Sequence, residues 1–204
     1  MSAESSDVLI IDSGGANIGS IVYAFERLGV SANLSDDITQ IESAARVILP
    51  GVGAARPAMQ QLHARGLVDV IRRLTQPVLG ICLGMQLLFE SSEEGDVECL
   101  GLIPGRVRAM RAAPDARVPH MGWNTLEVRT DAPLLAGIEQ DARAYFVHSY
   151  SAPVNRFTLA ESTHADAFAA VVRCENFHGV QFHPERSGDL GARLLKNFVS
   201  MSAA

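Results

Sequence analysis

The chain has 204 residues, a length at which a single domain spanning residues 1–204 is expected. It is 48% hydrophobic and 20% charged with a formal net charge of −6, which is typical of a soluble globular protein and leaves no basic stripe for nucleic acid. The N-terminus lacks the basic start and apolar core of a signal peptide, and no apolar run reaches membrane-spanning length. We therefore expect a cytoplasmic protein with no membrane partner.

The first half of the chain alternates short apolar runs with helical patterns. Strands are predicted at residues 8–11, 31–34 and 46–49. Helices are predicted from near Asn17 to Gly29 and, in two pieces separated at Gly66, across residues 59–74, with a weakly helical segment at 38–45. This alternation predicts an α/β fold with a mostly parallel central sheet and helices on both faces.

The next apolar run, residues 78–81, ends at Cys82, and a helical pattern follows at once and continues to Glu90. Gly80 and Gly84 stand two residues either side of the cysteine, which is the pattern of a nucleophile elbow on a strand-to-helix turn. The helix N-terminus favours the thiolate, and the N–H of Leu83 is a natural oxyanion donor. The alternative is a buried structural cysteine.

The loop Pro-Gly-Val-Gly at residues 50–53 directly follows the predicted strand 46–49. Its glycines permit conformations in which backbone N–H groups face a ligand, although a plain strand-to-helix turn remains the alternative. Because the carboxyl ends of parallel strands meet at one edge of a sheet, this loop is expected close to Cys82.

Beyond a polar break at residues 91–96 the pattern becomes rich in short β segments. Such segments are predicted at residues 106–108, 126–128, 144–150, 157–159, 169–173 and 179–182, and a closing amphipathic helix at 190–201. We expect an added antiparallel β region packed on the edge of the core sheet.

Residues 181–185, Gln-Phe-His-Pro-Glu, deliver a histidine from the end of a strand. A nucleophilic cysteine needs a base, and the base needs an acceptor on its other ring nitrogen. His183 and Glu185 supply these two roles, and an exposed loop histidine beside a solvated glutamate is the alternative. His120, His148 and His178 remain rivals for the base.

The stretch Pro-His-Met-Gly-Trp-Asn at residues 119–124 holds the only tryptophan and reads as a loop. Methionine, tryptophan and histidine grouped with glycine are typical of an interface anchor, and a tryptophan packed in the core is equally compatible with the pattern.

The remaining cysteines, Cys99 and Cys174, are irregularly spaced, and the chain has no C-x-x-C motif. With three cysteines in all, neither a disulfide framework nor a zinc site is indicated. We expect a reduced protein that holds no metal and no cofactor.

Residues 80–86 together with residues 181–185 resemble the triad signature of the class I glutamine amidotransferases. Within that family, residues 50–53, 121–124 and 145–150 resemble the glutaminase subunits of imidazole glycerol phosphate synthase, and the likeness extends over nearly the whole chain. A class I glutamine amidotransferase-like fold is therefore implied.

The resemblance implies glutamine hydrolysis by a triad of Cys82, His183 and Glu185, through a thioester on the cysteine. The oxyanion hole would use N–H groups of Leu83 and of Val52 or Gly53. The implied glutamine-binding residues are Gly51, Gln86, Glu94, Ser149 and Tyr150.

The resemblance also implies a heterodimer with a (β/α)₈-barrel cyclase subunit, which would receive the ammonia in histidine biosynthesis. The interface candidates are Asn17, His120, Met121, Trp123 and Asn124. Two alternatives stay open: the glutaminase of another class I amidotransferase, and a catalytically silent binding subunit.

Overall fold

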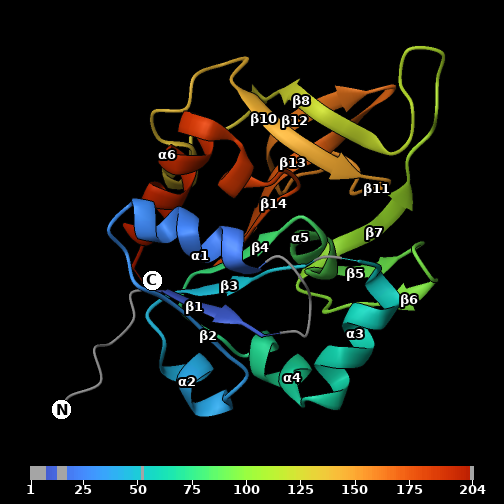
Figure 1. The fold of residues 1–204 in the computed structure, drawn as a ribbon. Coiled ribbons are helices and arrows are strands. Elements are labelled where there is room, and N and C mark those ends of the chain that lie inside the picture. Colours follow the sequence, from blue (N-terminus) through green and yellow to red (C-terminus); the bar gives the residue numbers. More distant parts are fainter. Residues whose placement is uncertain (1–7, 13–17, 52, 203–204) are drawn as a thin grey trace.

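The computed structural model describes residues 8–12, 18–51 and 53–202. Its centre is an eight-stranded sheet in the order β2-β1-β3-β4-β14-β13-β12-β9 (Figure 1). The first five strands of this order are parallel. They are β2 (Ala32–Ser35), β1 (Val8–Ile11), β3 (Val47–Leu49), β4 (Val78–Ile81) and β14 (Phe177–Val180). The predicted parallel core is confirmed.

Three antiparallel strands extend the sheet beyond β14: β13 (Asp166–Cys174), β12 (Thr158–His164) and β9 (Glu127–Val128). The expected antiparallel addition at the edge of the core sheet is thus present. The other strands form two smaller sheets: β8 (His120–Thr125) with β10 (Arg143–His148), and β11 (Tyr150–Ser151), β7 (Ile103–Ala109), β5 (Phe89–Ser92) and β6 (Val97–Glu98).

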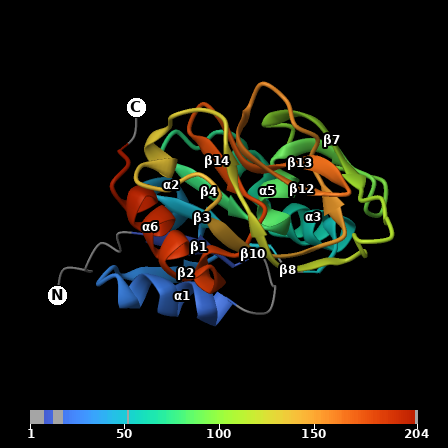
Figure 2. The same cartoon turned by 90° about the horizontal axis from the view of Figure 1, so that it is seen from above.

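Helices cover both faces of the parallel sheet (Figures 1 and 2). One face carries α1 (Ile18–Arg27) and α6 (Gly188–Val199), and the other carries α2 (Ile38–Ser43), α3 (Ala55–Ala64) and α4 (Leu67–Arg72). Successive strand residues point to opposite faces, so Ile10 enters the core beneath α1 and Ile11 enters the core on the other side. A continuous apolar run therefore marks a strand that is buried on both faces.

Gly66 separates α3 from α4 as the pattern predicted, and its φ of 67° is in the left-handed region that glycine adopts without strain. The remaining helical turns are α5 (Leu83–Leu87), η1 (Pro133–Leu135) and η2 (Pro184–Arg186). Among the residues that the structure describes, no helix is long and apolar enough to cross a membrane.

Two local predictions were wrong. The helix after Cys82 ends at Leu87 rather than continuing to Glu90, because residues 89–92 pair with β7 as strand β5 and the carbonyl groups of residues 87–89 accept N–H groups from residues 100–103. Residues 120–125 form strand β8 rather than a loop, because β10 supplies a pairing partner with Trp123 opposite Tyr145. In both cases the deciding partner is distant in sequence.

Candidate active site

Cys82 lies on a sharp turn between β4 and α5. Its φ is 54° and its ψ is −112°, a backbone conformation that residues other than glycine rarely adopt. A Cβ at Gly80 would come within 2.7 Å of the backbone of Gly84, and a Cβ at Gly84 would overlap the carbonyl oxygen of Leu49. The two glycines are therefore required by close backbone packing, and the predicted elbow geometry is present.

The register of two parallel strands brings the distant histidine to this turn. Gly80 pairs with Gly179 and Ile81 with Val180, so the chain leaves β4 and β14 at the same edge of the sheet. The N–H of Cys82 then donates to the carbonyl of Val180 at 2.8 Å. Residues 181–185 consequently emerge beside the cysteine although about a hundred positions separate them.

His183 is held between Cys82 and Glu185. Its Nδ1 donates to Glu185 Oε1 at 2.8 Å, and the Glu185 side chain is only 2% exposed. Burial lowers the pKa of His183, but hydrogen bonds with Cys82 and with Glu185 outweigh it and raise the pKa from its ordinary 6.5 to about 10. A proton on the imidazole is thus strongly favoured while both partners are in place.

The rival histidines lie in different surroundings. His178 is buried within β14, and burial lowers its pKa to about 4, with Arg173 adding to the effect. His148 Nε2 accepts from His120 Nδ1 at 2.9 Å, and its own Nδ1 donates to the carbonyl of Tyr150 at 2.8 Å. Both ring nitrogens of His148 are occupied, so His183 is the histidine whose second nitrogen faces the cysteine.

A cavity of about 340 Å³ opens above the elbow. Its lining residues include Gly51 and Gly53 from the loop after β3, Cys82 and Leu83 from the elbow, and His183. A Cβ at Gly51 would overlap the backbone of Gly84, so this loop packs directly on the elbow as expected. Val52, the other predicted oxyanion residue, lies outside the described residues.

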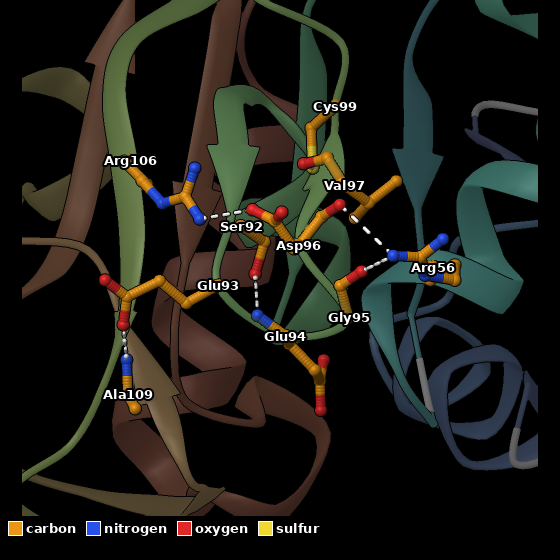
Figure 3. A network of polar contacts seen from close by, with 10 residues as sticks. All are labelled: Arg56, Ser92, Glu93, Glu94, Gly95, Asp96, Val97, Cys99, Arg106 and Ala109. Carbon is orange, nitrogen blue, oxygen red and sulfur yellow. Dashed lines mark hydrogen bonds and ion pairs between the residues drawn. The ribbon is translucent and has the colours of Figure 1, made fainter.

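Glu94 also lines this cavity, from the turn between β5 and β6 (Figure 3). Ser92 Oγ accepts the N–H of Glu94 at 3.1 Å, and Arg106 binds the carboxylate of Asp96 at 2.6 Å in the same turn. Glu94 Oε2 accepts the N–H of Ala55, the first residue of α3, at 2.8 Å. The turn therefore presents a carboxylate of fixed position to the cavity.

The other predicted substrate residues lie at different depths. Ser149 lines the cavity. Gln86 is 4% exposed, and its Nε2 donates to the carbonyl of Tyr150 at 2.8 Å and to Gln181 Oε1 at 2.9 Å. The Tyr150 side chain packs against the hydrophobic core. Gln86 and Tyr150 thus support the cavity from behind, through these hydrogen bonds and this packing.

Some of the predicted interface residues are exposed and others are buried. Met121 and Trp123 are 62% and 48% exposed on β8, and the indole of Trp123 lies edge-on to Tyr145. His120, on the same strand, is only 4% exposed and stacks on Phe146, so its side chain supports the strand from beneath. Asn124 Nδ2 donates to the carbonyl of Thr163 at 2.9 Å. Asn17 lies outside the described residues.

Sequence reasoning gave no role to Gln181, whose side chain is fully buried and whose Nε2 lies 3.9 Å from Cys82 Sγ. The available signal was a polar residue at the end of an apolar strand that also precedes the candidate base by two positions. Across residues 8–12, 18–51 and 53–202, no group of three or more His, Cys, Asp or Glu side chains could hold a metal ion.

Comparison with known proteins identifies the class to which the chain belongs. Residues 9–201 match the model of the family described as glutamine amidotransferase class-I. Solved structures with the same fold include a putative GMP synthase subunit from Thermoplasma acidophilum, at TM-score 0.72 and 19% identity, covering 94% of this chain and 91% of that one. Another is the glutaminase domain of Trypanosoma brucei CTPS, at TM-score 0.65 and 18% identity, covering 93% and 91%. The class is therefore that of the class I glutamine amidotransferases.

Relatives of higher sequence identity show which subfamily the chain belongs to. The imidazole glycerol phosphate synthase subunit HisH of Xanthomonas axonopodis pv. citri is 58% identical over 197 residues, which cover 97% of this chain and 98% of that protein. The HisH subunit of Xylella fastidiosa is 55% identical over 199 residues, covering 98% and 100%. The chain belongs to the family of HisH subunits of imidazole glycerol phosphate synthase, which confirms the resemblance seen in its motifs.

Proposed function

We propose that this chain, as a single glutaminase domain, hydrolyses glutamine to glutamate and ammonia and delivers the ammonia to a cyclase subunit. The observation that carries the proposal is the hydrogen-bonded alignment of Cys82, His183 and Glu185 at the mouth of a cavity, in a chain of the HisH family. This combination also argues against a catalytically silent subunit.

In the first half-reaction the Cys82 thiolate attacks the carboxamide carbon of glutamine, and the C=O π electrons move to the oxygen. When the tetrahedral intermediate collapses, the C–N bond breaks and His183 transfers its proton to the departing nitrogen, which leaves as ammonia. A thioester between the glutamyl carbon and the sulfur remains. The raised pKa of His183 supports this assignment, because it stores the proton beside the nucleophile.

In the second half-reaction neutral His183 takes a proton from water as the water oxygen attacks the thioester carbon. Collapse then breaks the C–S bond, returns the electron pair to sulfur and releases glutamate. Glu185, through its 2.8 Å hydrogen bond to Nδ1, keeps Nε2 directed at the reaction and stabilises the imidazolium in both halves.

The oxyanion hole in this proposal uses the N–H of Leu83 together with one from Val52 or Gly53. Leu83 and Gly53 both line the cavity, which supports their assignment. Gly51, Glu94 and Ser149 would contact the α-amino acid end of glutamine from the cavity wall, with Gln86 and Tyr150 holding that wall from behind.

The proposed partner is a (β/α)₈-barrel cyclase with which the chain forms a cytoplasmic heterodimer that acts as a lyase in histidine biosynthesis. Ammonia remains useful only if it reaches its acceptor undiluted and unprotonated, so the two sites must be sealed together. The exposed Met121 and Trp123 on β8 support a docking surface there, because such large apolar side chains are typical of interface cores. Asn124 and Asn17 complete the proposed surface, with His120 beneath it.

The test is replacement of Cys82 by alanine in the chain assembled with its cyclase. Glutamine hydrolysis should fall to the uncatalysed level, while co-elution of the two subunits should persist. Cys99→Ala is the matched control, because Cys99 is buried elsewhere and its thiol, with a pKa raised by burial to about 11, should leave hydrolysis unchanged. Hydrolysis retained by the Cys82→Ala complex would refute the proposal.

A further inference from the structure

A line of side-chain amides runs behind the nucleophile. Gln181 is fully buried, with its Nε2 at 3.9 Å from Cys82 Sγ and its Oε1 accepting from Gln86 Nε2 at 2.9 Å. Gln86 Nε2 also donates to the carbonyl oxygen of Tyr150 at 2.8 Å. Two side-chain amides in series therefore connect the backbone carbonyl of Tyr150, in β11, with the sulfur.

The carbonyl of Tyr150 fixes the orientation of both side-chain amides. A backbone carbonyl only accepts, so the nitrogen of Gln86 must face Tyr150. The same nitrogen also donates on its other side, where the oxygen of Gln181 accepts at 2.9 Å. The NH₂ group of Gln181 is consequently turned toward Cys82, and its N–H dipole points at the sulfur.

A pair of hydrogen-bonded histidines, His148 and His120, holds the carbonyl of Tyr150 in place. His148 Nδ1 donates to the same Tyr150 oxygen at 2.8 Å, which leaves its Nε2 as an acceptor for His120 Nδ1 at 2.9 Å. His120 Nε2 in turn lies 3.3 Å from Asn124 Nδ2, its available donor. Burial is the main cause that lowers the pKa of His120 to about 3, and the neighbouring histidines His148 and His164 add to the effect. The pair therefore stays neutral, with one tautomer at each ring.

Five further groups contact the sulfur or its proton donor or line the cavity beside them. His183 hydrogen-bonds with Cys82, with Glu185 behind it, and Glu94 lines the cavity that Cys82 opens into. His148 lines the same cavity but is neutral, since burial lowers its pKa to about 4. Val147 accepts from the thiol at 3.8 Å, a bond that only the protonated sulfur makes. Of the uncharged groups, Val147 favours the thiol and Gln181 favours the thiolate.

We propose that Gln181 is a positioning residue that donates its side-chain N–H to the sulfur of Cys82, favouring the thiolate at the start of the reaction and accepting the returning charge when the C–S bond breaks. The inference rests on the proposed role of Cys82 as nucleophile. A neutral donor suits both moments, because it stabilises the anion without competing for the proton that His183 carries.

The test is the pH dependence of Cys82 alkylation by iodoacetamide, followed by mass spectrometry of the peptide that contains Cys82. Gln181→Met preserves length and burial but removes the donor. We expect its alkylation midpoint to rise by roughly one pH unit, which is about a tenfold slower reaction on the acid side of the midpoint. Gln181→Glu, which places a carboxylate beside the sulfur, should raise the midpoint further.

Gln76→Met is the matched control. Gln76 is also buried and hydrogen-bonded, to the carbonyl of Ile41 at 2.9 Å, but it precedes β4 and so lies at the end of that strand opposite Cys82. Its substitution should therefore leave the midpoint unchanged. Gln86→Met is a second variant. We expect a smaller rise of the alkylation midpoint, because Gln181 keeps its N–H donor but loses the hydrogen bond from Gln86 that orients it.

An unchanged midpoint in Gln181→Met would overturn the inference, as would an equal shift in Gln76→Met. The proposed function is judged separately, by whether the wild-type complex hydrolyses glutamine. An active wild-type complex with an unchanged Gln181→Met profile would refute the role of Gln181 alone.

Discussion

Two histidines, His183 and His148, line the same cavity and differ in their hydrogen-bond partners. His183 donates to the carboxylate of Glu185 at 2.8 Å in one pair, and His148 accepts from His120 at 2.9 Å in the other. Burial alone would lower the pKa of every one of these histidines. It does so for His148, to about 4, whereas hydrogen bonds to Cys82 and Glu185 bring the pKa of His183 to about 10.

The comparison teaches that the hydrogen-bond partner, and not burial, decides whether a buried histidine carries charge. A carboxylate compensates an imidazolium that has lost its water, while a neutral second imidazole supplies a hydrogen bond but no negative charge. The charged pair is suited to moving a proton. The neutral pair is suited to holding a backbone carbonyl in place.

The largest expected effect comes from breaking the charged pair with Glu185→Gln. The amide still accepts from Nδ1 but no longer compensates the imidazolium, so the kcat for glutamine hydrolysis should fall by about 10³- to 10⁴-fold. Steady-state assays of the assembled complex measure this. Glu42→Gln, at an exposed ion pair with Arg73, is the control, and a comparable loss there would argue for a general structural effect.

A smaller effect is expected on the stability of the protein at acidic pH, from the neutral pair His120 and His148. Between pH 6.5 and about 3 the unfolded chain protonates His120 and the folded chain does not, so the free energy of unfolding falls as the pH falls through this window. His120→Gln removes the titrating group. Urea unfolding at pH 7 and pH 4 should show this variant losing roughly 2–3 kcal/mol less than the wild type. Parallel pH profiles would contradict the neutral assignment.

The smallest expected effect is at the outer end of the neutral pair. Asn124→Ala removes the donor to the carbonyl of Thr163 and the group facing His120 Nε2, which should cost about 1 kcal/mol of unfolding free energy at pH 7. Asn33→Ala, on the exposed edge strand β2, is the control and should change stability by less than about 0.5 kcal/mol. Equal stabilities of the two variants would remove Asn124 from the network.

Local sequence patterns were sufficient for the parallel core and for the elbow. Continuous apolar runs marked β1, β3 and β4, because strands buried on both faces admit no polar positions. The glycines around Cys82 marked the turn because their hydrogen atoms occupy space where a Cβ would overlap backbone. The same reasoning was less successful at β8, whose Met, Gly and Trp read as a loop until β10 pairs with them.

The sequence by itself determined the strands and helices of the parallel core, the strained turn at Cys82, and the residue types of a nucleophile, a base and an orienting acid, since each is a property of a few neighbouring residues. Only the tertiary structure decided which histidine reaches the cysteine, that His120 is buried while Trp123 is exposed, and that Gln181 faces the sulfur. These depend on the register of β14 beside β4 and of β8 beside β10, pairings between segments far apart along the chain. The pattern within one segment does not specify which distant segment will lie beside it.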